Sequence, residues 1–162
     1  MGRRIGVVTA AVVVGALALY GVAQARHGAL QTRMNGAQEV NAETGEPGAG
    51  DPDGTGSAKI RLHPEADQIC FKLTWSNIGS PHAAHIHEAA AGSNGGVVVG
   101  LFTGETPLPS TISGVNGCAS GVDDGLSDRI RNNPAGFYVN VHNEEYPGGA
   151  IRGQLKHTPK RR

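Results

Sequence analysis

The sequence predicts an all-β fold, an antiparallel β-sandwich or barrel with one short helix before the penultimate strand. Short stretches of alternating polar and apolar residues recur along the chain. Glycine and proline are frequent between them, with 25 Gly and 9 Pro in 162 residues. No long stretch repeats its apolar residues with helical periodicity, so the chain is expected to form one domain of short strands.

Eight strands are expected, and the third shows the pattern most clearly. It has apolar residues at every second position, namely Ile69, Phe71, Leu73 and Trp75. Successive side chains of a strand point to opposite faces, so these four share one face. A turn at 64–67 predicts a hairpin with the preceding strand. The expected strands lie near residues 32–40, 55–63, 67–76, 82–88, 96–102, 111–119, 136–142 and 149–156.

One helix is expected over residues 122–131, because acidic residues stand at its start and arginines at its end. Residues 41–56 are rich in glycine and proline and hold four acidic residues, which predicts an exposed loop. The spacing Asp51-x-Asp53-Gly54 resembles the start of a calcium loop, but the distal glutamate of such a loop is missing.

The N-terminus has the pattern of a secretory signal peptide over residues 1–25. Two arginines precede an uncharged apolar stretch, which ends at Ala23-Gln24-Ala25. We expect cleavage after Ala25 and a secreted, periplasmic or cell-envelope location. An uncleaved anchor is the alternative, because about 18–20 apolar residues can span a bilayer. The expected organisation beyond it is a short lead at 26–32, one domain at 33–156 and a basic tail at 157–162.

The net charge limits the classes of binding partner, and the cysteine content bears on the cellular compartment. Without residues 1–25 the chain has 12 basic and 14 acidic residues, a net charge of −2, which is not the basic field that nucleic acids require. The only cysteines are Cys70 and Cys118. In an oxidising compartment they are expected to form a disulfide, and two buried free thiols are the alternative.

Three histidines predict a metal site. His85 and His87 are two residues apart on an expected strand, so both side chains lie on one face, and His142 shares a face with Asn140 on a later strand. If the two strands are neighbours, the three imidazoles can converge on one copper or zinc ion. Because only the neutral imidazole binds a metal, the affinity for the ion should decrease as the pH drops below about 6–6.5. Residues expected around such an ion are Glu88, Asn140 and Arg152.

Other interpretations of these residues stay open. The histidines can instead hydrogen-bond within a polar layer and serve the fold alone. Arg152 is expected to pair with a carboxylate such as Glu88 or Glu144. His82 is a further candidate ligand, but its offset of three residues from His85 places it on the other face of an ideal strand. The other histidines, His27, His63 and His157, are expected on the surface. The sequence has no GxSxG elbow and no glycine-rich phosphate loop before a helix, so no enzymatic activity is predicted.

Three segments of the sequence resemble the CHRD domain family. They are the stretch 34–40 (MNGAQEV), the stretch 84–87 (AHIH) with the GGVVV that follows it at 95–99, and the long closing motif 137–155. The resemblance implies an immunoglobulin-like antiparallel β-sandwich or barrel in a secreted protein. It also implies that His85, His87 and His142 belong to the domain's own pattern.

Two functions follow from these observations. The first is storage or handling of a transition metal by the histidine cluster. The second is a non-catalytic binding module, whose loops 41–56 and 103–110 contact an extracellular protein or a surface polymer. A looser similarity to copper–zinc superoxide dismutase rests on the HxH strand alone, because no bridging histidine is found, and dismutase activity is not predicted.

Overall fold

The structure is a computed structural model that describes residues 29–159. The expected signal peptide and the last three residues of the basic tail lie outside this range. Among the residues described, no helix is long and apolar enough to cross a membrane.

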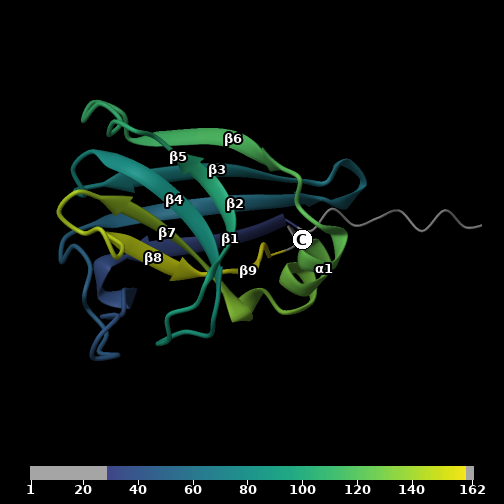
Figure 1. Cartoon of the computed structure of the whole chain (residues 1–162), viewed down its shortest axis with the longest axis horizontal. Coiled ribbons are helices and arrows are strands. Elements are labelled where there is room, and N and C mark those ends of the chain that lie inside the picture. The colour runs from purple at the N-terminus through teal and green to yellow at the C-terminus, as the bar shows by residue number, and fades with distance from the viewer. Residues whose placement is uncertain (1–28, 160–162) are drawn as a thin grey trace, which may run out of the picture.

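Nine antiparallel strands form one sheet that curls into a nearly closed barrel (Figure 1). In space the strands follow the order β5-β4-β7-β8-β1-β2-β3-β6, and the short β9 pairs with β1. The edge strands β5 and β6 border the open seam. The strands are β1 (Ala29–Asn35), β2 (Thr55–His63), β3 (Gln68–Ser76), β4 (Pro81–Glu88), β5 (Val97–Thr103), β6 (Gly114–Ser120), β7 (Phe137–Asn143), β8 (Ile151–Gln154) and β9 (Lys156–His157).

The predicted all-β class is confirmed, and each predicted strand has its counterpart. The largest differences are at the two ends of the domain. Strand β1 begins at Ala29, so residues 29–32 of the expected lead belong to the barrel. It ends at Asn35, whose side chain accepts a hydrogen bond from Gln38 N and starts the 3-10 helix η1 (Gly36–Gln38). The single strand expected at 149–156 is divided into β8 and β9.

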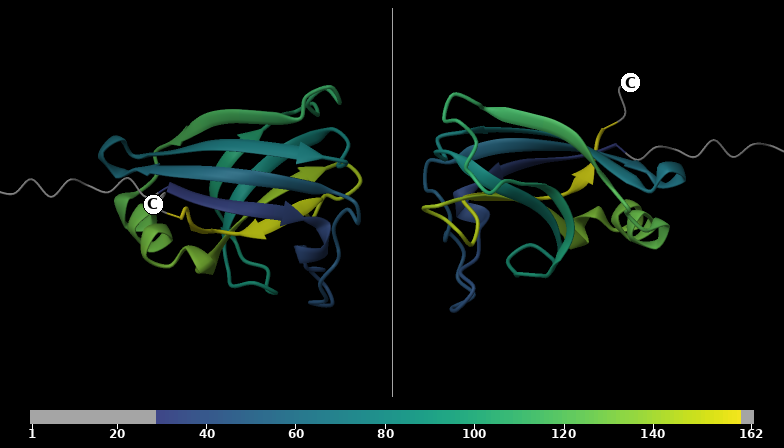
Figure 2. Two further views of the ribbon diagram at one scale, coloured as in Figure 1. Left: turned by 180° about the vertical axis from the view of Figure 1, so that it is seen from behind. Right: turned by 45° about the horizontal axis from the view of Figure 1, so that its top comes forward.

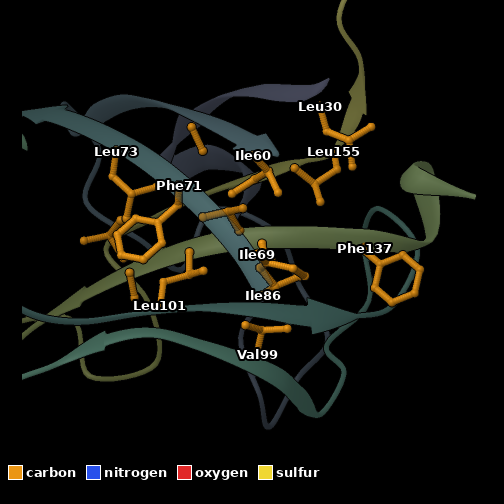
Figure 3. Packing of buried hydrophobic residues seen from close by; sticks show 14 of the residues in the cluster. Leu30, Ile60, Ile69, Phe71, Leu73, Ile86, Val99, Leu101, Phe137 and Leu155 are labelled. Atoms are coloured by element: carbon orange, nitrogen blue, oxygen red, sulfur yellow. The ribbon is translucent and has the colours of Figure 1, made fainter. Parts of the chain in front are cut away.

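Alternating side chains of the strands fill the barrel (Figure 3). The four apolar residues of β3 are all buried, as predicted, and the Trp75 indole donates to Ile112 O at 3.0 Å. From the facing side, Ile86 of β4 and Val139 and Val141 of β7 point inward with no exposed surface. The residues that alternate with them must therefore point outward, which places His85, His87 and His142 on the outer face of the barrel.

Helix α1 (Asp124–Asn132) covers one end of the barrel (Figure 1). The Asp123 side chain caps it by accepting from Leu126 N at 3.0 Å. Leu126 and Ile130 lie on its buried face and join the core. The remaining 3-10 helices are η2 (Pro64–Ala66), in the predicted turn between β2 and β3, and η3 (Pro134–Gly136), which leads from α1 into β7.

The loop between η1 and β2 is exposed over residues 41–49, as expected. Its second half packs against the barrel, because Asp51 N donates to Ala150 O at 2.8 Å and Gly50 N donates to Gly36 O at 3.2 Å. Gly50 has no room for a side chain there, since a Cβ would lie 2.5 Å from Ala150 O. The loop is therefore fastened to the segment that joins β7 and β8.

Cys70 of β3 and Cys118 of β6 form a disulfide between directly opposed residues of neighbouring strands. The bond closes a separation of 48 residues and fastens the edge strand β6 to β3.

Candidate metal centre

Strands β4 and β7 are neighbours, which brings the three predicted histidines together. In the antiparallel register His85 lies opposite Asn140, and His87 lies opposite Tyr138. His142 is two residues beyond Asn140 on β7, opposite Ala83, and is therefore a diagonal neighbour of His85. One ring nitrogen of each histidine lies within 4.8 Å of those of the other two. His82 of the same strand is outside this group.

His87 has a fixed orientation and an unused ring nitrogen. Its Nδ1 donates to Gly95 O at 2.9 Å, because a carbonyl oxygen can only accept. Its ring stacks on that of Tyr138, with centroids 4.8 Å apart and planes 4° from parallel. The other nitrogen, Nε2, is buried and has no hydrogen-bond partner. A buried acceptor without a partner is uncommon and indicates that something is missing at this position.

His142 is held in the same way from the other side. Its Nδ1 donates to Pro147 O at 3.0 Å, so in the neutral ring Nε2 carries the lone pair. Burial lowers the pKa of His142 to about 4, although the hydrogen bond to Pro147 acts in the opposite direction. The ring is therefore neutral near pH 7, which is the form that binds metals.

The Nε2 atom of His142 lies 3.1 Å from His85 Nδ1 and 3.0 Å from Asn140 Oδ1. Without a metal, His85 can donate its Nδ1 proton to this lone pair. The Asn140 oxygen also faces His142 Nε2, and both atoms are acceptors. This contact is favourable when a cation lies between the two atoms, or when the Asn140 amide is turned so that its nitrogen donates. Burial and the neighbouring His87 and His82 also lower the pKa of His85.

A buried arginine positions the loop that carries Gly95. Arg152 of β8 donates to Asn94 Oδ1 and to Ser93 O, both at 2.9 Å, and its guanidinium lies 4.0 Å from the centre of the Tyr138 ring. Asn94 in turn donates to Val40 O at 2.9 Å. The expected pairing of Arg152 with Glu88 or Glu144 was wrong, because the guanidinium is used to hold a loop.

Glu88 and Asn140, both expected around the ion, are placed differently. Glu88 is exposed and pairs with Arg129 of helix α1, at 3.3 Å. As the residue after His87, it points to the opposite face of β4. Asn140 is 2% exposed and lies directly against His142. Asn140 is therefore in contact with the histidine group, whereas Glu88 is not.

A cleft of about 370 Å³ opens beside His87. Its floor is formed by His87, Tyr138 and Asn140, and its walls come from the loops that precede β2, β5 and β8. Glu39 lines it and is 3% exposed, with Oε1 buried and without a partner. Burial raises the pKa of Glu39 to about 8, and the charge of Arg152 acts against this rise.

Sequence reasoning did not identify Glu39, Tyr138 or the two carbonyls that orient the histidines. Glu39 and Tyr138 lie within the segments of the CHRD resemblance, so they were marked as part of a pattern but without a role. Pro147 also lies within these segments, but a backbone carbonyl is not specified by residue type, and the one local constraint is that Gly95 must be glycine. A Cβ there would collide with the carbonyl group of Glu88.

Comparison with protein families shows a match to the CHRD domain over residues 30–155. The match includes all three histidines and strands β2 to β8 in full. Comparisons with curated proteins and with solved structures found no match.

Proposed function

We propose that this chain, which belongs to the CHRD domain family, binds one copper or zinc ion through His85, His87 and His142 and stores or transfers it outside the cytoplasm. The observation that carries the proposal is the buried Nε2 of His87, which has no hydrogen-bond partner, in a group of three histidines that each place one ring nitrogen within 4.8 Å of the other two. Backbone carbonyls fix His87 and His142 in the tautomer whose Nε2 can bind a metal.

The size of the group suits a first-row transition metal. Metal–nitrogen bonds are about 2.0–2.1 Å long, so two ligand nitrogens of one ion lie at most about 4.2 Å apart. Ligand nitrogens at the tetrahedral angle lie about 3.4 Å apart. Closing the group around a tetrahedral ion therefore requires nitrogens that are up to 4.8 Å apart to approach by as much as about 1.4 Å, which rotation of the side chains can supply. Three imidazoles suit copper and zinc, and a fourth position remains for Asn140, water or a receiving molecule.

Export is part of the same proposal. It is supported by the order of basic, apolar and small residues at 1–25 and by the disulfide between Cys70 and Cys118. A single domain with a metal site and no predicted nucleophile is suited to buffering or delivery of the ion. We infer no reaction for it.

Calorimetric titration of the metal-free protein with Zn(II) and Cu(II) tests the proposal. We expect one equivalent to bind, and His87→Ala to weaken binding by at least about 100-fold. The matched control is His157→Ala, the same substitution at an exposed histidine of β9, which should bind like the unmodified protein.

Equal affinity of the His87→Ala and His157→Ala variants would contradict the proposal. The histidines would then be structural, and the chain would be better described as a binding module. Its exposed loops at 41–56 and 103–110 would be the surfaces to test for an extracellular protein or a surface polymer.

A further inference from the structure

The outer face formed by β9, β1, β2 and β3 carries a group of exposed cations. Each alternates along its strand with a residue that points into the barrel. We call this surface the basic face, and its cations are Arg33, Lys59, Arg61, Lys72 and Lys156. The strands that bear it are in front in the left view of Figure 2.

The strands of the basic face, and their neighbour β6, carry none of the 14 acidic residues of the chain. The other three cations between residues 29 and 159 are already engaged. Arg129 pairs with Glu88, Arg131 pairs with Asp128, and Arg152 is buried in the loop contact described above. Every cation that the structure leaves unpaired within this range is therefore on one face, although the net charge of the whole chain is zero.

The register of the strands arranges part of these cations in a row. Lys59 lies directly opposite Lys72, and Gln31 of β1 lies between Lys59 and Lys156. On the far side Lys72 lies opposite Asn116 of β6. The row crosses five strands, or about 19 Å at the usual strand spacing. Like charges that face each other across two strands destabilise a sheet, and a bound polyanion would reverse this cost.

The residues around the row indicate which polyanion fits. Hydroxyl and amide side chains stand between the cations, among them Gln31, Ser57, Thr74 and Asn116. Two hollows of about 350 and 670 Å³ flank Lys59 on this face. Such groups can donate to and accept from sugar hydroxyls while the cations bind acidic groups.

Two other classes of polyanion fit this face less well. Among the residues described, the only exposed large apolar side chain is Val97 of β5, which is not on this face. The basic face therefore has no apolar group to insert into a bilayer and no aromatic ring on which a nucleic-acid base can stack.

We propose that the basic face binds an acidic polysaccharide, with the chain of sugars lying across the strands along the row of lysines. This goes beyond the metal site and is independent of it. In the order of strands around the barrel, β2 and β3 lie on the side away from β4 and β7, so the core separates the two surfaces. The protein would thus be retained on an acidic matrix while its metal site remains accessible.

Affinity electrophoresis of the full chain through gels containing alginate or neutral dextran tests this proposal. We expect retardation by alginate that decreases with added salt, and none by dextran. Lys59→Gln/Lys72→Gln should weaken binding to alginate about tenfold or more. The matched control is Arg129→Gln/Arg131→Gln, which removes the same charge from helix α1 and should bind normally.

Folding of the variants is checked by thermal unfolding, where loss of the facing lysines should leave the melting temperature unchanged or raise it. Equal weakening by both double variants would overturn the proposal in favour of net charge. Tighter binding to phosphatidylglycerol vesicles or to single-stranded DNA than to alginate would overturn the polysaccharide as the partner. Retained alginate binding by His85→Ala/His87→Ala is the expected result that separates this surface from the metal site.

Discussion

Glu39 is a buried carboxyl group whose charge the fold disfavours. It is 3% exposed, and burial raises its pKa to about 8, against the opposing charge of Arg152. The unfolded chain releases this proton near pH 4.5, whereas the folded protein keeps it until about pH 8. Between these values the folded state binds more protons than the unfolded state, so the contribution of Glu39 to stability falls as pH rises.

Replacing Glu39 by glutamine should remove this dependence, because glutamine is similar in size and uncharged. We expect the variant to be more stable than the unmodified protein at pH 8, by an amount on the order of 4 kcal/mol, and similar to it at pH 5. Urea unfolding of both metal-free proteins at the two pH values measures the difference. A difference that does not change with pH would show that Glu39 is not protonated in the folded protein.

His142 has the opposite linkage. Its pKa is lowered from 6.5 to about 4, chiefly by burial, so its contribution to stability is complete above pH 6.5 and is lost as pH falls toward 4. Metal-free protein should therefore lose stability between pH 6.5 and 4.5, and His142→Gln should show a smaller loss. Guanidinium unfolding at these two values provides the comparison. The same shift means that protons compete for this ligand only near pH 4, below the range expected from an ordinary histidine.

At the scale of elements, the loop between β4 and β5 couples the arginine of β8 to a metal ligand of β4. Arg152 holds Ser93 and Asn94, and the next residue, Gly95, orients His87. Three strands and one loop must therefore be assembled before His87 has its final orientation. The loop is expected to be the part of the site most sensitive to substitution outside the ligands.

Substituting Arg152 with glutamine should weaken zinc or copper binding by about 10- to 100-fold, the usual effect of removing a group that orients a ligand. Calorimetric titration measures the affinity, and hydrogen exchange of residues 89–96 should show faster exchange in the variant. Arg129→Gln is the control, since it removes an exposed arginine that pairs with Glu88 of β4, the strand that carries His87. Unchanged affinity with a more mobile loop would mean that His87 does not depend on this support.

The strands were predictable because their signals are local. The alternation of polar and apolar residues predicted the buried face of β3 and the common face of His85 and His87. The charge pattern and Pro134 predicted a helix that begins within two residues of the observed start of α1. The two ends of the domain were less predictable. Strand β1 begins among residues with weak alternation, and its pairing with β2 and β9 decides its extent.

At the scale of the whole molecule, the site depends on contacts between distant segments. The sequence indicated the three histidines. The hypothesis of a metal site, however, had to assume that β4 and β7 are neighbours. The burial of Glu39, the stacking of Tyr138 and the two orienting carbonyls depend on how three loops fold over one face. No local pattern contains that information, which is why the partner of Arg152 was predicted wrongly.

The disulfide also acts at this scale, because it fastens an edge strand of the barrel. Bridging residues 48 apart stabilises a fold by about 4 kcal/mol in the chain-entropy description. Cys70→Ala/Cys118→Ala should therefore unfold at lower denaturant concentration, and its metal affinity should be unchanged because β3 and β6 are away from β4 and β7. Loss of metal binding in a variant that is still folded would show that the two sides of the barrel are coupled.

Elemental analysis of the protein isolated from an oxidising compartment, without added metal, tests the central claim most directly. The unmodified protein should contain about one equivalent of copper or zinc, and a His85→Ala/His87→Ala variant prepared in parallel should contain none. Absence of metal from both proteins, with the variant only less stable, would contradict the claim and leave the histidines a structural role.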